Sequence, residues 1–528
     1  MTLAPRFLVN LWAGFRVTRF ARRLGKPGAD AAGQQAAFAS AMQRTAGTEF
    51  GRAHKLAADT TYAQFRDAVP LRTYDHFGPL VARMAAGEAN VLGPGRCRFF
   101  VETAGTTGLA PKLLPVPETM LQHYRAGLRD ALFLYAARAG HAGVFLGRHV
   151  HVGASTALVE AAGGWRTGLD GMLALCLSPW VEANLYAPAP AIARLPEGDA
   201  KTAATARATR PRDVTLLGGL PAAAQALAAA LQGAAPDGGS RPPLPAVWPN
   251  LECFLHHGAP LGLFGEALRA SLASVNFHEV YMAAEGVFAA QDDFHQPGLR
   301  LLAEAGIFYE FLPLSDYHEA SLAQANLHCV PLGKVKAGMD YVMFVTTPAG
   351  LCRCAVGDIV RFVSIAPPRL QFVGRTGLYL NPFGEQVTER ELLETMLAVC
   401  ARNGWRVVNF HVAPYQHRIA AGQQVRCHEW WLELGTHTAR TPTANVLGPE
   451  FDAELAMRNR DYASRRNDRT IHSPQVRLVM PGIFAEWAAK HHKTAGASKM
   501  PRCHSTRLIA DQLAALARFH PETAAPFG

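Results

Sequence analysis

Val-Glu-Thr-Ala-Gly-Thr-Thr-Gly-Leu-Ala-Pro-Lys, residues 101–112, is the most informative stretch of the chain. A strand-like run at 98–102 leads into it, and a helix-like run at 116–138, with Pro117 in the first turn, follows it. The glycines let the backbone approach a phosphate, hydroxyl and amide groups can donate hydrogen bonds to it, and Lys112 adds positive charge. The stretch is not a Walker A loop, because no Lys-Ser or Lys-Thr follows a glycine at the required spacing. It predicts a phosphate-binding loop, with a turn of no function as the simpler alternative.

Strand-like and helical runs alternate from this loop to about residue 380, which predicts an α/β fold with a sheet covered by helices. The pattern breaks at Pro382 and Gly384, where we expect the hinge between domains. The later runs predict helices at 389–400 and 449–465 and strands at 405–412, 428–434 and 475–480. We therefore expect a large N-terminal α/β domain, residues 1–380, and a smaller, mobile C-terminal α+β domain, residues 381–528.

The composition is that of a globular protein with more than one domain, since 528 residues are too many for one compact core. The net charge of +10 is spread along the chain, which favours small anionic ligands over nucleic acid. Nine scattered cysteines are typical of reduced thiols in a cytoplasmic protein. No apolar run is long enough to span a membrane. Residues 1–24 predict an amphipathic helix that docks onto the protein itself or, as the alternative, lies on a membrane.

Four further segments contain side chains suited to a nucleotide site. Glu285 follows an apolar strand, and Asp358 follows a glycine in a predicted tight turn, where its carboxylate can accept both ribose hydroxyls. Leu-Gln-Phe-Val-Gly-Arg ends in Arg375, and Ser-Lys-Met-Pro-Arg contains Lys499. Taken singly, each of these residues is an ordinary turn or surface residue.

Taken in order, the five segments resemble the Gretchen Hagen three family of acyl-acid amido synthetases. These plant and bacterial enzymes are a branch of the adenylate-forming superfamily that includes acyl-CoA synthetases and firefly luciferase. The resemblance begins near residue 40, and the alanine- and arginine-rich composition suggests a bacterial member. The chain departs from the family pattern at Ala283-Ala284, which replace serines, at Gln386, which is a lysine in many relatives, and at the cysteines that flank Arg353.

The resemblance implies a site for ATP and Mg²⁺. It implies that Glu285 holds the magnesium and takes part in catalysis, and that Lys499 is a catalytic lysine carried in and out of the active site. The other implied nucleotide contacts are Thr103, Ala104, Gly105, Thr106, Thr107, Gly108, Lys112, Tyr281, Asp358 and Arg375.

The implied activity is adenylation of a carboxylic acid by ATP and transfer of the acyl group to an amine, such as an amino acid. A thioester-forming ligase and a non-catalytic nucleotide-binding homologue remain alternatives. The sequence identifies neither the acid nor the amine, and it leaves the oligomeric state open. Candidate residues of the acyl pocket are His149, His151, Ser155, Trp180 and Tyr186. The pair His256-His257 lacks the spacing of a helical zinc motif, so we expect these histidines to be solvated or hydrogen-bonded.

Overall fold

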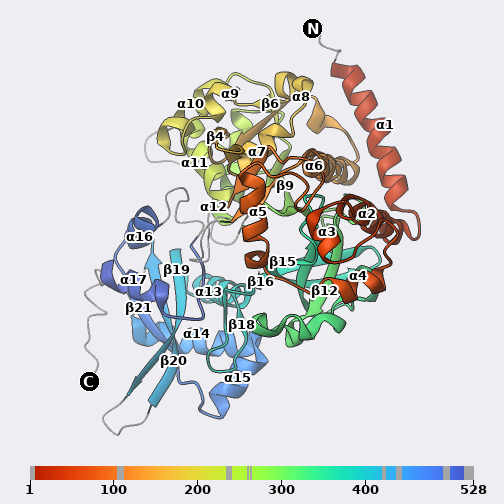
Figure 1. Cartoon of the computed structure of the whole chain (residues 1–528). Coiled ribbons are helices and arrows are strands. Elements are labelled where there is room, and N and C mark those ends of the chain that lie inside the picture. Colours follow the sequence, from red (N-terminus) through yellow and green to blue (C-terminus); the bar gives the residue numbers. More distant parts are fainter. Residues whose placement is uncertain are drawn as a thin grey trace. The chain divides into compact units, whose positions relative to one another are not determined.

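The computed structural model describes residues 6–103, 112–233, 241–258, 261, 265–418, 424–435, 443–491 and 500–516. The chain forms two compact units, and the second unit begins at Val373 after the large first unit (Figure 1). The predicted fold class is confirmed, because a large α/β unit is followed by a smaller unit of helices and strands.

A twelve-stranded sheet forms the centre of the first unit. Its order is β13 (Val330–Pro331), β12 (Phe308–Pro313), β14 (Asp340–Thr346), β15 (Cys354–Ile365), β16 (Pro368–Arg375), β11 (Leu299–Leu301), β10 (Gly286–Ala290), β9 (Asn276–Ala283), β8 (Cys253–His256), β7 (Val214–Gly219), β3 (Arg148–Val152) and β6 (Tyr186–Ala187). The pairs β9–β8, β8–β7, β7–β3 and β3–β6 are parallel. The pairs β9–β10, β10–β11, β13–β12, β12–β14 and β14–β15 are antiparallel. Every residue of β7 is buried, as expected for a parallel strand covered on both faces.

The predicted phosphate loop begins at a smaller sheet of four strands. Its order is β2 (Leu113–Pro115), β1 (Phe99–Glu102), β5 (Gly164–Thr167) and β4 (Val159–Ala161). The prediction of a strand, a loop and a helix missed β2, which pairs antiparallel with β1 immediately after the loop. It also began the helix too early: α6 spans Glu118–Ala139, and Pro117 is the cap that precedes it, with an extended backbone.

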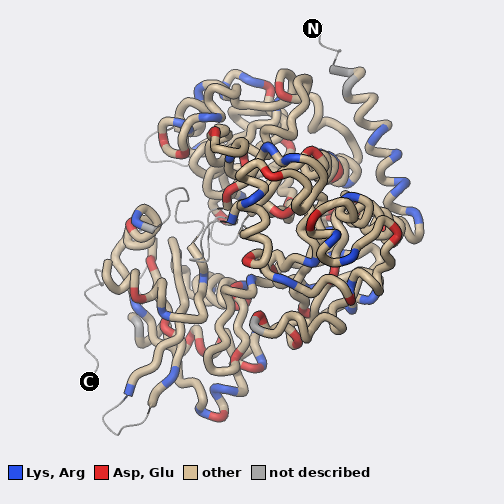
Figure 2. The backbone as a smooth tube through the Cα atoms, in the orientation of Figure 1, with Lys and Arg blue, Asp and Glu red and all other residues tan. Residues whose placement is uncertain are grey.

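Helices cover the sheets of the first unit, and the N-terminal helix α1 (Arg6–Leu24) is one of them. Besides α1 and α6, the α-helices in the described part of this unit are α2 (Ala29–Thr45), α3 (Glu49–Ala53), α4 (Tyr62–Ala68), α5 (Gly78–Ala85), α7 (Leu169–Leu175), α8 (Pro179–Asn184), α9 (Pro190–Ala193), α10 (Asp199–Thr209), α11 (Pro221–Gln232) and α12 (Gly265–Leu272). The expectation that α1 docks onto the protein is confirmed, because Val17 and Phe20 are buried in the same core cluster as residues of α6. The opposite face of α1 leaves Leu11 and Phe15 exposed. Basic residues are spread along the same helix (Figure 2).

The second unit packs helices against a sheet with the order β19 (Val407–Arg418), β20 (Gln424–Leu434) and β21 (Gln475–Val479). A short ribbon of β17 (Tyr379–Leu380) and β18 (Val387–Thr388) precedes it. The helices are α13 (Glu389–Asn403), α14 (Ala444–Arg458), α15 (Arg460–Asn467), α16 (Ile483–His491) and α17 (Leu508–Leu516). Trp430, at the centre of the core, stacks on Phe451 with ring centroids 4.5 Å apart.

The single helix predicted at 449–465 is wrong, because the chain forms two helices there. Asn459 separates them: its side chain accepts a hydrogen bond from the Tyr462 amide at 2.7 Å and so caps the start of α15. Within the described residues, no helix is long and apolar enough to cross a membrane.

Candidate active site

The two ends of the predicted phosphate loop are hydrogen-bonded to each other. The Thr103 amide donates to the Lys112 carbonyl at 2.9 Å, and the Lys112 amide donates to the Thr103 hydroxyl at 3.1 Å. The Lys112 ammonium lies 5.5 Å from the centre of the Tyr74 ring. The hairpin of β1 and β2 therefore fixes the base of the loop. The remaining predicted loop contacts, Ala104, Gly105, Thr106, Thr107 and Gly108, lie outside the described residues.

Glu285 lies in the turn that joins β9 to β10 and is 8% exposed. Its charge acts on Tyr74 and Tyr124: burial raises the pKa of both phenols, and the nearby Glu285 carboxylate raises it further. Gly286, which follows Glu285, is closely packed, because a Cβ atom there would collide with the side chains of Ile307 and His123. Lys112 and Glu285 therefore share Tyr74 as a neighbour, which brings a cation and a carboxylate from two predicted motifs into one region.

Tyr281 and Asp358 form a direct contact between two motifs. The Tyr281 hydroxyl donates to Asp358 Oδ2 at 2.6 Å, and Asp358 is 5% exposed. Strand β15 carries Asp358 just after Gly357, whose φ of 90° is costly for residues with a side chain, at a bulge where the pairing with β14 shifts register. The predicted turn at the Gly-Asp pair is wrong, because the pair lies inside a strand and the glycine forms a bulge instead.

The second unit contains the two remaining predicted residues. Arg375 is the last residue of β16, which crosses from the first unit into the second at Val373, and Lys499 lies outside the described residues. The residues after Lys499 are firmly held: Met500 is buried in a core cluster, and the Arg502 amide donates to Glu389 Oε1 at 3.0 Å. The Pro501 carbonyl contacts His411 Nδ1 at 2.8 Å.

The five candidates for the acyl pocket have different surroundings. His149 is partly buried on β3: one ring nitrogen contacts the Val144 carbonyl at 2.9 Å, and burial lowers its pKa to about 4. Trp180 is 40% exposed on α8, and the Ser155 hydroxyl donates to the Arg194 carbonyl at 2.7 Å. Tyr186 lines a cavity of about 410 Å³, together with Thr156, Leu158, Glu182 and Arg194. His151 stacks beside Tyr186 with ring centroids 6.5 Å apart.

Asp170 is a residue that sequence reasoning missed. Its Oδ1 is 2.8 Å from His151 Nε2, and its Oδ2 accepts from the Ala154 amide at 2.7 Å. Burial opposes its ionisation, but the hydrogen bond from His151 and the nearby His257 lower the pKa of the carboxyl to about 2. His256 and His257 are both buried, so of the two expected environments, solvated or hydrogen-bonded, the structure excludes the solvated one. From the sequence, the only signal for the cluster of Asp170, His151 and His257 is that the carboxyl ends of parallel strands meet at one edge of the sheet.

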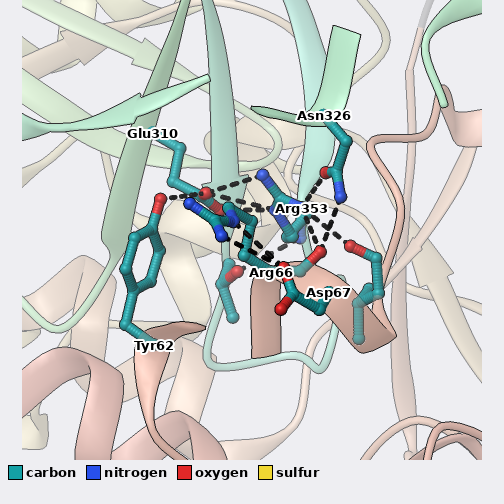
Figure 3. Close-up of polar contacts among 8 residues, drawn as sticks. Tyr62, Arg66, Asp67, Glu310, Asn326 and Arg353 are labelled. Carbon is teal, nitrogen blue, oxygen red and sulfur yellow. Dashed lines mark hydrogen bonds and ion pairs between the residues drawn. The ribbon is translucent and has the colours of Figure 1, made fainter. Parts of the chain in front are cut away.

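Arg353, which matched the family pattern beside the Gly-Asp pair, belongs to the structural core. Its side chain is fully buried and its guanidinium is 2.9 Å from Glu310 (Figure 3). The same guanidinium donates to the Val69 carbonyl at 2.8 Å, and Glu310 also accepts from the Tyr62 hydroxyl at 2.9 Å. Arg353 therefore joins β12 to the helical segment around α4.

Comparison with solved structures defines the class of fold. The chain is similar to a GH3.15 acyl acid amido synthetase, with a TM-score of 0.71 and 18% identity over 94% of this chain and 96% of that one. It is also similar to a 2-hydroxyisobutyryl-CoA ligase, with a TM-score of 0.55 and 13% identity over 95% of this chain and 92% of that one. The fold is thus one that an amido synthetase and a CoA ligase share.

The sequence comparisons identify the family. The models of the GH3 family N-terminal, central and C-terminal domains match residues 29–162, 300–375 and 390–507 in that order, which together are more than half of the chain. The chain belongs to the GH3 (Gretchen Hagen three) family.

Among curated relatives, the indole-3-acetic acid-amido synthetase GH3.8 of Oryza sativa subsp. indica is 30% identical over 37% of this chain and 33% of its own length. The indole-3-acetic acid-amido synthetase GH3.3 of Arabidopsis thaliana is 27% identical over 39% of this chain and 35% of its own length. The chain thus matches about a third of the length of these two relatives.

Proposed function

We propose that this chain is an ATP-dependent ligase that adenylates a carboxylic acid and transfers the acyl group to the amine of an amino acid. The observation that carries the proposal is the match to all three domain models of the GH3 family. Support from the geometry is the contact between Tyr281 and Asp358, with Glu285 on the same hairpin as Tyr281. We further propose that the enzyme is bacterial and acts in the cytoplasm, where its nine free, buried cysteines would stay reduced.

The proposed roles follow from the chemistry of each side chain. Asp358 is the acceptor for the ribose hydroxyls, and the hydroxyl of Tyr281 orients its carboxylate. Thr103 and Lys112 fix the base of a loop that donates to the phosphates of ATP, and Arg375 adds a positive charge to the nucleotide site.

Glu285 fits a magnesium ion, because it offers a largely buried carboxylate and Mg²⁺ prefers oxygen ligands. Bound Mg²⁺ would neutralise charge on the phosphates of ATP. Beside it, Lys112 adds its own charge near Tyr74.

The reaction requires activation because a carboxylate has no good leaving group. The carboxylate oxygen attacks the α-phosphorus, pyrophosphate leaves, and the acyl-AMP then reacts with an amine, releasing AMP. The protein aligns the reacting oxygens and stabilises the charge that develops on the phosphate, and we propose Lys499 as the residue that does this at the α-phosphate. A rotation of the proposed mobile C-terminal domain, residues 381–528, would then withdraw Lys499 and open the path for the amine.

Pyrophosphate release from ATP is the test, with a panel of carboxylic acids that begins with indole-3-acetic acid. Each acid is assayed with amino acids, with coenzyme A and with neither, and the products are identified by mass spectrometry. We expect one class of acid to give pyrophosphate and an amide. A thioester as the main product would show a CoA ligase instead, and no ATP turnover with any acid would overturn the assignment as an enzyme.

A further inference from the structure

We propose that His151, Asp170 and His257 form a binding site for a divalent transition-metal ion of the zinc type. Each side chain offers one ligand atom, and the three atoms all lie within 4.8 Å of one another. The three residues come from separate parts of the first unit: β3, the start of α7 and the residue after β8. This proposal is independent of the proposed ligase activity and of the magnesium site at Glu285.

The topology of the sheet explains why the two histidines meet. Strands β3 and β8 are both parallel neighbours of β7, and His151 pairs across β7 with Gly218, which in turn pairs with Leu255. Because side chains alternate along a strand, His151 and His257 project from the same face at the carboxyl ends of these strands. Gly218 places no side chain between them, and the two rings are parallel to within 5° with their centroids 6.2 Å apart.

The carboxylate of Asp170 is held in place from two sides. Its Oδ1 lies 2.8 Å from His151 Nε2, and its Oδ2 accepts from the Ala154 amide at 2.7 Å. The loop after β3 can wrap over it because residue 153 is glycine, where a Cβ atom would lie 2.7 Å from Asp170 Oδ2. The Lys201 ammonium secures the same loop by donating to the carbonyls of Gly153, Ala154 and Ala193 at 2.6–3.0 Å. Such outer contacts orient a metal ligand before the ion binds.

The donor set indicates the class of ion. Two imidazole nitrogens and one carboxylate oxygen suit Zn²⁺ and similar first-row ions, whereas Mg²⁺ and Ca²⁺ prefer oxygen ligands alone. Bonds of about 2.1 Å require donor atoms roughly 3.0–3.4 Å apart, so small side-chain rotations would complete the site.

Three protein ligands leave at least one position open for water or a substrate group. Gly171, the residue after Asp170, and Tyr186, beside His151, line the cavity of about 410 Å³. The open position would therefore lie close to this cavity, where a carboxylate or an amine could reach the ion.

Metal binding to the full-length protein tests the proposal. The protein is stripped with a chelator, and Zn²⁺ is titrated with the bound metal measured by elemental analysis; Co²⁺ is titrated in parallel for its visible absorption bands. We expect one ion per chain and a higher melting temperature with zinc, because the ion binds only the folded state. Asp170→Asn and His257→Gln should each lower the affinity by more than about 100-fold, since they remove a direct ligand.

His141→Gln is the matched control, because His141 is an exposed histidine outside the cluster. Circular dichroism of the metal-free variants shows which of them are folded. Equal metal binding by wild type and a folded His257→Gln variant would overturn the proposal, as would a wild-type protein that retains no ion after buffer exchange. If neither variant folds, the number of ions bound per chain and the Co²⁺ spectrum of the wild type decide. Visible bands that show no nitrogen ligand on the bound Co²⁺ would also overturn the proposal.

Discussion

Arg353 and Glu310 are an ion pair that the solvent does not reach, with exposed side-chain fractions of 0% and 1%. Removing one charge leaves the other buried without compensation, which costs far more than the pair contributes. We predict that Glu310→Gln lowers the free energy of unfolding by about 3–5 kcal/mol, measured by urea denaturation. Asp340→Asn, which breaks the more exposed pair with Arg361, is the control and should cost at most about 1 kcal/mol. Equal effects of both variants would mean that burial does not govern the Arg353 pair.

Asp358 gives a second prediction at the scale of the residue. As a ribose acceptor it would contact ATP equally in the ground state and the transition state, so its loss should raise KM more than it lowers kcat. We predict that Asp358→Ala raises the KM for ATP, whereas Tyr281→Phe, which removes only the orienting hydroxyl, has a smaller effect of the same kind. Steady-state kinetics with varied ATP measures both. Normal ATP binding with lost turnover in Asp358→Ala would show that the ribose assignment is wrong.

The elements show what local sequence signals can and cannot predict. The helix predicted at 389–400 begins where α13 begins and ends three residues before α13 does; in the structure a capping box of Thr388 and Glu391 fixes its start. The strand β2 was missed because it has only three residues and depends on pairing with β1 across the loop. The break at Asn459 was missed because asparagine caps a helix only where the chain has already turned, which local periodicity does not reveal.

The segment after Lys499 gives a prediction for one element of the second unit. Because Met500 and Arg502 are anchored there, Lys499 is carried by this unit, and its proposed role is limited to the adenylation step. Lys499→Ala should suppress formation of acyl-AMP but spare amide formation from chemically made acyl-AMP. The two half-reactions are measured separately, with Lys490→Ala on α16 as the control for loss of a surface lysine. Equal loss in both half-reactions would contradict a rotation that removes Lys499 before the second step.

At the scale of the whole molecule, the sequence does not predict contacts between residues that lie far apart along the chain. The family motifs indicated Tyr281 and Asp358 separately. Only the structure shows that these two residues, 77 positions apart in the sequence, are joined by a hydrogen bond. Arg353 lies in the same motif as Asp358, and only its contacts with Glu310 and the Val69 carbonyl show that it serves the core. Asp170 had no motif at all, since its partners His151 and His257 meet only through the order of the parallel strands.

Acid should destabilise the whole molecule well before its carboxylates become protonated. Burial lowers the pKa of His123 to about 4 and the pKa of His278 and His411 to about 3. His123 must stay neutral, because one ring nitrogen contacts the Ala305 carbonyl and the other accepts from the Val287 amide. In the unfolded chain each histidine takes up a proton near pH 6.5, so between that pH and about 4 the unfolded state binds more protons than the folded state. The free energy of unfolding should therefore fall on acidification by about 1.4 kcal/mol per pH unit for each of the three histidines. Urea denaturation at pH 7, 6 and 5 measures this slope. The variant His123→Gln should reduce the slope by the contribution of one histidine, about 1.4 kcal/mol per pH unit. A free energy of unfolding that stays constant from pH 6.5 to 5 would show that burial does not hold these histidines neutral.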